Sequence, residues 1–286
     1  YKTLKEGQKV SFDVEADPKN AAKLRKLYVE LTGRAELVRL ATLGNWNSRY
    51  YKYDQRQAEQ MILDYEAHDV PLDNIVLDTD WRMASDRGIG YDVDTNLFPD
   101  MNGYYRFAHD HGVDVMFNDH PEPQDGCTSC IDPKEVAYRA MRLAEHLENG
   151  LDTWWYDRNW HTKLVSPAEG IEPETWGMYI FSEVTKHAWQ NKAKNNVVYR
   201  RPDIMSNVDN IVNGRYCGIG NSASHRYSIQ WTGDVGSDNF ALAEAVTDML
   251  RCGDNAIPYA HPDCGGHTGN PDKDLYLRWM QFGSLA

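Results

Sequence analysis

The sequence predicts a single α/β catalytic domain built as a (β/α)8 TIM barrel. Short apolar strands alternate with amphipathic helices through most of the 286 residues, and this alternation is typical of parallel α/β folds. Acidic residues follow several of the strands, where α/β barrels keep their active sites. No GxGxxG fingerprint follows an early strand, which argues against a doubly wound dinucleotide-binding fold.

The predicted domain covers residues 17–286 and follows a short segment, 1–16, of uncertain origin. Helices are expected where apolar residues recur every three to four positions, at 17–32, 54–68, 101–111, 133–149, 175–190, 240–252 and 275–282. Strands are expected at 38–43, 74–81, 113–118, 151–157, 195–201, 210–217, 225–234 and 255–260. Because 195–201 is only a possible strand, about seven strands result, one fewer than the eight that close such a barrel. We therefore expect the sequence to end before the last strand of the barrel.

Four carboxylates stand at or just beyond the ends of predicted strands. The run at 151–156 has the bulky apolar content of a strand covered on both faces, and it ends on Asp157. Asp80, Asp234 and Asp263 hold comparable places after other strands. A single acid there is more often a helix cap or an ion-pair partner. Four acids after four strands predict a common site at one end of the barrel.

Composition narrows the classes of function. The net charge of −13 disfavours binding to nucleic acids and to anionic membranes, and no apolar run approaches the roughly 20 residues of a membrane span. Aromatic residues make up 12% of the chain, and several stand beside carboxylates, a combination that suits sugar binding. The five cysteines form no evident disulfide framework, which favours the cytoplasm over secretion. The CxxC pair Cys127 and Cys130 lacks a second pair, so we expect no metal site.

Asp157 and Asp234 are candidates for the two carboxyl groups that cleave a glycosidic bond with retention. One must be ionised to attack the anomeric carbon, and the other must be protonated to help the leaving oxygen depart. Aromatic neighbours raise the pKa of one such acid, and a nearby arginine keeps the other ionised. The candidates for that arginine are Arg158, Arg215 and Arg226.

Seven segments in order resemble the catalytic barrel of glycoside hydrolase family 31. This family contains α-glucosidases, α-xylosidases and some α-galactosidases and α-N-acetylgalactosaminidases. The segments are LGNWNSRYYKY (43–53), VPLDNIVLDTDWR (70–82), LFPDMNGYYRFAHDHGVDVMFNDHPEP (97–123), GLDTWWYD (150–157), HRYSIQWTGD (225–234), PDCGGH (262–267) and LYLRWMQFGS (275–284). The resemblance covers about residue 20 to 286. It implies a retaining, exo-acting glycosidase of O-glycosyl compounds that acts on an oligosaccharide or α-glycoside without a cofactor.

The resemblance also implies roles for individual residues. Asp157 corresponds to the nucleophile, and Asp234, in the WTGD element, corresponds to the general acid/base. Asp80 and Asp263 would accept hydroxyl groups of the sugar, and Arg215 would orient the nucleophile. The further residues implied to line the sugar site are Trp46, Trp154, Trp231, His267 and His120.

Two departures from the family pattern leave the substrate open. Arg158, Asn159 and Trp160 follow the nucleophile where α-glucosidases usually have Met-x-Glu, and a further sugar-binding histidine would lie beyond Ala286. The β-sandwich and β-domains that flank the family's barrel are also not in this sequence. The alternatives are a non-catalytic carbohydrate-binding protein or inactive fragment, and a transglycosylase that uses the same intermediate. The oligomeric state is not predicted.

Overall fold

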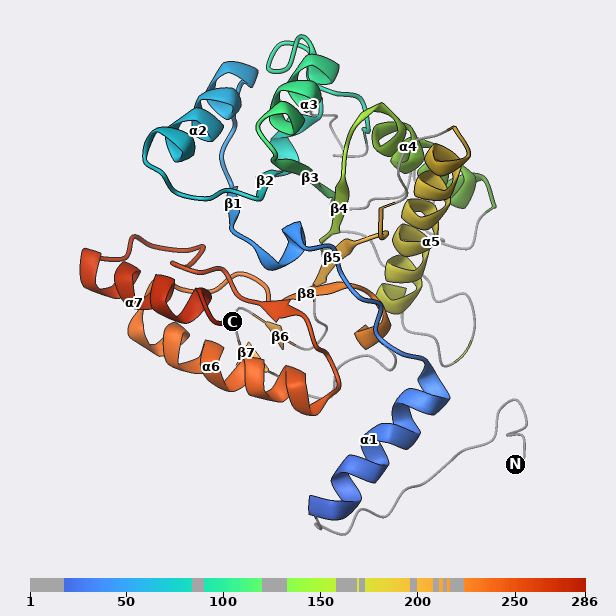
Figure 1. Cartoon of the computed structure of the whole chain (residues 1–286), viewed down its shortest axis with the longest axis vertical. Helices are drawn as coiled ribbons and strands as arrows, with labels where there is room; N and C mark the ends of the chain where they lie inside the picture. The colour runs from blue at the N-terminus through green and yellow to red at the C-terminus, as the bar shows by residue number, and fades with distance from the viewer. Residues whose placement is uncertain are drawn as a thin grey trace. The chain divides into compact units, whose positions relative to one another are not determined.

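A computed structural model gives the fold of the chain (Figure 1). It describes residues 18–83, 90–119, 133–157, 169, 173–195, 200–207, 211–212, 215–216 and 224–286. The chain divides into two compact units, Tyr1–Arg34 and Ala35–Ala286. The domain boundary expected after residue 16 lies outside the described residues and stays a prediction.

The described part of the first unit is one helix, α1 (Pro18–Thr32). The helix ends at Gly33, whose φ of 97° lies in the left-handed region that glycine adopts without strain. The amide of Gly33 donates a hydrogen bond of 2.9 Å to the carbonyl of Val29. This helix agrees with the predicted range, 17–32.

The second unit is built on a seven-stranded parallel sheet with the order β1-β2-β3-β4-β5-β8-β9. Its strands are β1 (Trp46–Arg49), β2 (Asn74–Leu77), β3 (Asp114–Asp119), β4 (Thr153–Tyr156), β5 (Ile204–Asn207), β8 (Ile229–Trp231) and β9 (Ala260–His261). Each strand pairs with the next one along the sheet in parallel. Strands added in chain order by parallel pairing are the pattern of a TIM barrel. The predicted class is confirmed, with seven barrel strands in the described residues.

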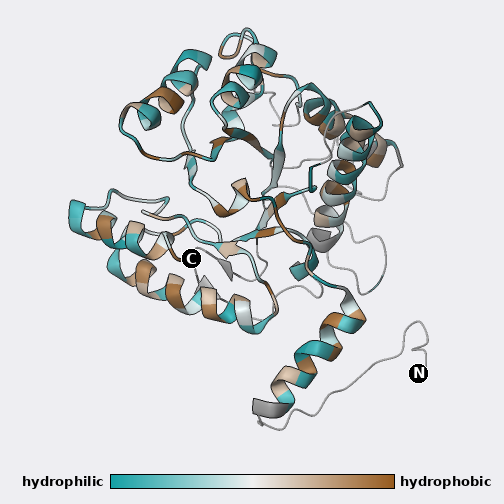
Figure 2. Cartoon of the chain, in the orientation of Figure 1, coloured by the Kyte–Doolittle hydropathy of each residue, from teal (hydrophilic) through white to brown (hydrophobic). Residues whose placement is uncertain are grey.

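In the described residues an α-helix follows every strand of the sheet except β5, and these helices surround the sheet (Figure 1). They are α2 (Gln55–Ala67), α3 (Met101–Asp110), α4 (Pro133–Asn149), α5 (Pro173–Lys194), α6 (Asn239–Asp254) and α7 (Lys273–Gly283). Each mixes hydrophobic and hydrophilic residues along its length (Figure 2), as expected of a helix with one face on a sheet and one in solvent. Among the described residues, no helix is long and apolar enough to cross a membrane.

The structure corrects the predicted strands at two places. In the predicted strand 38–43, residues Ala41–Leu43 form a 3₁₀ turn, and β1 lies instead in the polar stretch that follows. Since β1 pairs only with β2, it is an edge strand and needs no continuous apolar run. The other correction concerns the predicted strand 210–217, whereas most of the possible strand 195–201 lies outside the described residues. The barrel strand between α5 and β8 is β5, whereas β6 (Ile211–Val212) and β7 (Arg215–Tyr216) form a separate antiparallel pair.

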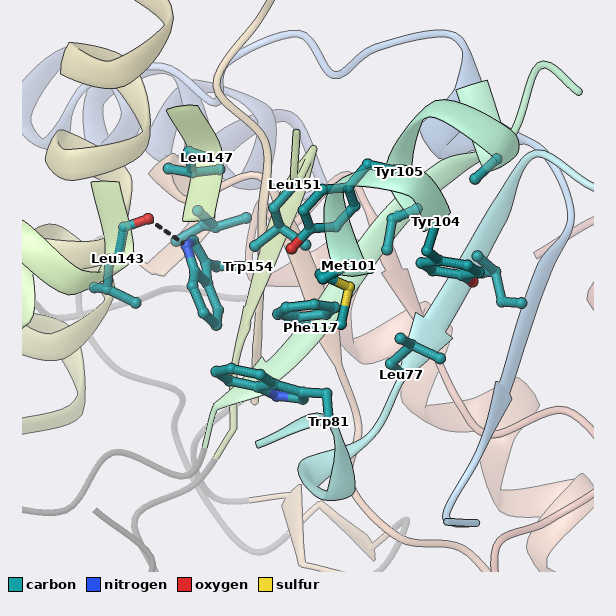
Figure 3. Packing of buried hydrophobic residues seen from close by; sticks show 14 of the residues in the cluster. Leu77, Trp81, Met101, Tyr104, Tyr105, Phe117, Leu143, Leu147, Leu151 and Trp154 are labelled. Carbon is teal, nitrogen blue, oxygen red and sulfur yellow. Dashed lines mark hydrogen bonds between the residues drawn. The ribbon is translucent and has the colours of Figure 1, made fainter. Parts of the chain in front are cut away.

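Alternate residues of a strand point to opposite faces of the sheet, so the strands contribute to two apolar clusters. The outer cluster packs with residues of the covering helices and includes Ile75, Leu77, Val115, Phe117 and Trp154. Leu77, Phe117 and Trp154 are labelled in Figure 3. The inner cluster includes Val76, Met116, Trp155, Met205 and Trp231. The rings of Trp46 on β1 and His261 on β9 lie 6.1 Å apart between centroids. The first and last strands therefore curve toward each other around the inner cluster.

Candidate active site

A polar layer follows the inner apolar cluster at the C-terminal ends of the strands. Two residues beyond the inner apolar side chains of β2, β3 and β4 come Asp78, Asn118 and Asp157. A step of two returns to the same face of a strand, so all three residues belong to the interior of the barrel. They are 8%, 1% and 4% exposed. Because β3 lies between β2 and β4, Asn118 stands between the two acids.

Asn118 connects the two acids by hydrogen bonds. Its Nδ2 donates to Asp78 Oδ1 at 2.9 Å and to Asp157 Oδ2 at 3.0 Å. Asp78 Oδ1 also accepts from the backbone amide of Thr79 at 2.7 Å, which caps the 3₁₀ turn Thr79–Trp81. The backbone amide of Asp157 donates to the carbonyl of Asp119 at 3.0 Å. The candidate nucleophile is therefore held by its backbone and by its carboxylate.

The structure brings Asp78, which was not predicted, to Asp157 through Asn118, and the role of Asp80 in the sugar site stays a prediction. Asp80 is half-buried in the turn after β2, and among the described contacts no hydrogen bond joins it to the network of Asn118. The signal that identifies Asp78 is its phase, because it lies two residues after the inner side chain of Val76. Asp80 lies beyond the end of the strand, where this alternation no longer applies.

The loops after β8 and β9 bring together a second group of polar side chains. One ligand atom from each of Asp234, Asp263 and His267 lies within 4.8 Å of the others. His267 Nδ1 lies 3.7 Å from Asp234 Oδ1, and Trp231 Nε1 donates to Asp263 Oδ1 at 2.6 Å. Two carboxylates and an imidazole are also donor types that bind divalent cations. They are the residues that would hold a metal in the part of the chain that the structure describes.

Close contact between these two loops keeps the second group together. Ser237 Oγ donates to the carbonyl of Gly265 at 2.8 Å, and its backbone amide donates to the carbonyl of Thr268 at 2.8 Å. At Gly266 the φ of 88° is left-handed, and a Cβ there would lie 2.6 Å from the backbone nitrogen of Ser237. The position thus requires glycine. The two loops carry Asp234 and Asp263 at a fixed separation.

The electrostatics of Asp263 link the two polar groups. The pKa of Asp263 is raised to about 7, mainly by burial and also by the negative charges of Asp234 and Asp157, although hydrogen bonds from Trp231 and the Val235 backbone oppose the rise. Asp234 and Asp263 are neighbours in the loops after β8 and β9, and Asp157 follows β4 at the same, C-terminal end of the parallel sheet.

The predicted aromatic residues lie in three different surroundings. Trp231 contacts Asp263 and packs edge-on against Trp155 with centroids 4.7 Å apart. Trp46 is half-buried at the inner cluster. Trp154 is fully buried on the outer face, where its Nε1 donates to the carbonyl of Leu143 in α4 at 3.1 Å (Figure 3).

The placement of Trp154 corrects the expectation that it lines the sugar site. Trp154 precedes Asp157 by three residues, an odd step that puts it on the opposite face of β4. Its neighbour Trp155 shares the face of Asp157 and belongs to the inner cluster. Strand alternation would have selected Trp155, Asn118 and Asn207, the last of which is 8% exposed at the end of β5. The sequence reasoning did not single out these three residues.

Several predicted residues cannot be placed in the site. The backbone of Arg215 lies in β7, and its side chain lies outside the described part of the structure. His120, residues 158–160 and the CxxC pair also lie outside the described residues.

His267 is exposed, and its ring lies 6.3 Å from that of Tyr50 between centroids. It thus stands at the outer side of the second polar group.

Comparison with known proteins agrees with this geometry. The model of the glycosyl hydrolases family 31 TIM-barrel domain matches residues 35–128 and 119–286. The chain belongs to glycoside hydrolase family 31. It is 23% identical over 314 residues to an α-xylosidase of Emericella nidulans and 25% identical over 298 residues to one of Saccharolobus solfataricus. These matches cover 98% and 91% of this chain but only 39% and 38% of the two relatives.

Solved structures of family 31 enzymes and related proteins have the same fold. The cycloalternan-degrading enzyme of Trueperella pyogenes, in complex with isomaltose, matches with a TM-score of 0.67 at 14% identity over 90% of this chain and 43% of that chain. A family 31 α-xylosidase of Xanthomonas citri matches with a TM-score of 0.67 at 19% identity over 92% of this chain and 33% of that one. Another structure of the Trueperella enzyme is a complex with a covalent intermediate.

Proposed function

We propose that this chain is the catalytic barrel of a retaining, exo-acting α-glycosidase. The substrate is an oligosaccharide or α-glycoside, from which a terminal α-linked sugar is released through a covalent glycosyl-enzyme intermediate on Asp157. The observation that carries the proposal is that Asp157, buried after β4, and Asp234, which lies beside Asp263 after β8, both stand at the C-terminal ends of parallel strands of one sheet. Two acids from different strands around one location are what the retaining mechanism requires.

The surroundings of the two acids favour different roles in this mechanism. Asp157 is 4% exposed and accepts a hydrogen bond from Asn118, which holds its carboxylate in one orientation. This environment suits a nucleophile that attacks the anomeric carbon. Asp234 is more exposed and lies 3.7 Å from His267, which suits an acid that protonates the departing glycosidic oxygen at the outer side of the site.

The second half of the reaction returns the enzyme to its starting state. Asp234, now ionised, takes a proton from water, and the water oxygen attacks the anomeric carbon and breaks its bond to Asp157. We expect Asp80 and Asp263, and in addition Asp78, to accept hydroxyl groups of the bound sugar. No step of this mechanism requires a metal or an organic cofactor.

The substrate can be identified with a panel of 4-nitrophenyl α-glycosides of glucose, xylose, galactose and N-acetylgalactosamine. This chain and the longest gene product that contains it should be measured side by side, because the curated relatives are more than twice its length. We expect release of nitrophenol from one or two members of the panel. Sugar affinity without turnover would support a non-catalytic carbohydrate-binding protein, and sugar transfer in excess acceptor would support a transglycosylase.

The assignment of the nucleophile is tested by Asp157→Asn and Asp157→Gly. Removing the nucleophile of a retaining glycosidase should lower kcat by at least about 10³-fold. With azide present, Asp157→Gly should convert the α-glycoside into the β-glycosyl azide. Azide then occupies the space of the missing carboxylate and attacks the anomeric carbon from the β face, opposite the leaving group. Asp110→Asn, at the exposed end of α3, is the matched control and should keep the parent rate. Wild-type turnover by Asp157→Asn would reject Asp157 as the nucleophile.

A further inference from the structure

Asn118 is a nearly buried amide whose hydrogen bonds go to two acids from two different strands. It is 1% exposed, and the two N–H groups of its Nδ2 are directed to Asp78 Oδ1 and Asp157 Oδ2 at 2.9 and 3.0 Å. Two carboxylates that share one nitrogen lie close together and repel each other when both are ionised. A shared donor offsets part of this repulsion, because hydrogen bonds to charged acceptors are about twice as strong as neutral ones.

The orientation of the amide is set by the acids. With Nδ2 toward the two carboxylates, Asn118 Oδ1 is buried and has no hydrogen-bond partner among the described residues. A buried acceptor without a partner costs free energy, yet turning the amide would place Oδ1 against two carboxylate oxygens. The two charge-assisted bonds therefore determine the orientation that is present.

Asn118 itself is anchored on a strand that is paired on both sides. In the parallel register, Phe117 pairs with Leu77 of β2, and Asn118 pairs with Trp155 of β4. The carbonyl of Asn118 accepts a hydrogen bond of 2.8 Å from Trp81 Nε1. A side chain on a doubly paired strand can hold a neighbouring group within narrow limits.

We propose that Asn118 is a positioning residue for the nucleophile, which keeps the Asp157 carboxylate ionised and aimed and couples it to Asp78. The inference rests on the proposed function only for its consequence in catalysis. The hydrogen bonds themselves predict that Asp157 ionises at a higher pH when the amide is removed, whether or not the chain hydrolyses a glycoside. Asn118 acts through Asp157 and needs no contact with the reacting sugar.

The first test is a titration of Asp157 in Asn118→Leu, which keeps the size of the side chain and removes its donor. With ¹³Cγ-labelled aspartate, the Asp157 resonance is the one that Asp157→Asn removes. Loss of a hydrogen bond to a charged group should move its titration midpoint up by about one to two pH units. Asn118→Asp, which adds a like charge, should move it at least as far. An unchanged midpoint in Asn118→Leu would overturn the inference.

The matched control is Asn74→Leu. Asn74 is also 1% exposed. It is the first residue of β2, at the N-terminal end of the strand and away from Asp157, and it donates from Nδ2 to the carbonyl of Ala41 at 2.7 Å. Its replacement removes a buried amide of the same size and should lower stability by a similar amount. If Asn74→Leu moved the Asp157 midpoint as far as Asn118→Leu, the shift would reflect general loosening and the inference would fail.

The second test measures the consequence in catalysis with α-configured cyclophellitol aziridines. The nucleophile opens the aziridine ring and forms an ester, and the ring nitrogen takes up a proton, so the protein gains the whole mass of the probe. Labelling of the parent at Asp157 is expected at neutral pH. In Asn118→Leu the labelling rate at a pH below the parent's midpoint should fall about 10- to 100-fold, as a shift of one to two pH units implies, and recover as the pH rises. An equal loss at every pH would contradict the proposed ionisation effect.

The two tests separate failure of the inference from failure of the proposed function. If no probe of gluco, xylo, galacto or N-acetylgalactosamine configuration labels the parent, the proposed function is contradicted, and the carbon titration still decides the role of Asn118. If the parent is labelled and the midpoint of Asp157 does not move in Asn118→Leu, the function stands and the inference is rejected.

Discussion

At the scale of single residues, Asp263 shows how a site can oppose stability. Burial and the neighbouring charges raise its pKa from 3.8 to about 7, so the folded protein binds the proton more tightly than the unfolded chain does. The stability that this proton contributes is present below the unfolded pKa and is lost as the pH rises through the folded value. Ionised Asp263 is therefore a cost of the folded state above neutral pH, a trade that is common at functional sites.

This cost predicts the behaviour of Asp263→Asn, which cannot ionise. We expect the variant to melt at a higher temperature than the parent at about pH 8 and to lose this advantage at about pH 3, below the unfolded pKa, where Asp263 is mostly protonated in both states. Thermal unfolding followed by circular dichroism at the two pH values measures the difference. Asp110→Asn, on an exposed position, should show no such pH dependence, and an equal gain for Asp263→Asn at both pH values would contradict the raised pKa.

For single residues, the sequence predicts which acids are functional more readily than it predicts the face of a strand to which a side chain points. The acids at the ends of β4 and β8 could be found because a carboxylate after an apolar run is unusual. Trp154 and Trp155 are adjacent and chemically alike, and only the direction of the strand decides which one belongs to the inner cluster. Once Asp157 is taken as inward, a step of two selects Trp155. Applying the same step to β2 would also have selected Asp78.

At the scale of elements, helix starts are specified by local chemistry, and α2 is an example. The Asp54 carboxylate accepts the backbone amide of Gln57 at 2.7 Å, and the Gln57 side chain accepts the amide of Asp54 at 3.0 Å, which forms a capping box. Asp54→Ala should lower the free energy of unfolding by about 1 kcal/mol, as measured by urea denaturation.

The control for this prediction lies on the same helix. Asp64 is exposed on α2 and accepts only from the side chain of Gln60 among its described side-chain contacts. Asp64→Ala should change the free energy of unfolding by less than about 0.5 kcal/mol. Equal losses for the two variants would mean that removal of any acid from α2 has this effect and that the cap contributes nothing specific.

Helices could be predicted more closely than strands because their signals are local. The predicted helix 133–149 coincides with α4, and the others differ at their ends by a few residues. Strand β1 could not be found, because its pairing with β2 rather than its own sequence makes WNSR a strand. Likewise β5 is only four residues long, and its sequence gives no stronger strand signal than the apolar residues within 195–201.

At the scale of the whole molecule, an ion cluster joins distant parts of the chain at the N-terminal ends of the strands, opposite the candidate site. Its members are Arg39, His109, Asp114, Asp152, Arg200 and Asp203. The backbone amide of Arg39 donates to Asp203 Oδ2 at 2.8 Å across 164 residues of sequence, and Arg200 Nη1 lies 2.9 Å from both Asp114 and Asp152. Partners this far apart could not be predicted, because their pairing depends on the completed sheet. In barrels this end is associated with stability rather than catalysis.

His109 gives this cluster a pH dependence. Its Nε2 lies 2.8 Å from Asp152 Oδ2, and that hydrogen bond raises the pKa of His109 against the effect of burial. The stability from this contact is therefore complete below the unfolded pKa of about 6.5 and is lost as the pH rises through the folded value. His109→Gln should thus lower the melting temperature more at about pH 5.5 than at about pH 8.5.

The difference in melting temperature between the parent protein and His109→Gln isolates the contact between His109 and Asp152. Burial lowers the pKa of His146, which gives a pH dependence of opposite sign, but His146 is present in both proteins and cancels in the difference between them. His187→Gln, on an exposed imidazole 3.9 Å from Glu183, should have a small effect at both pH values. If His109→Gln lost as much stability at high pH as at low pH, the ring would act by packing alone, and the charge of Asp152 would be balanced by Arg200 without it.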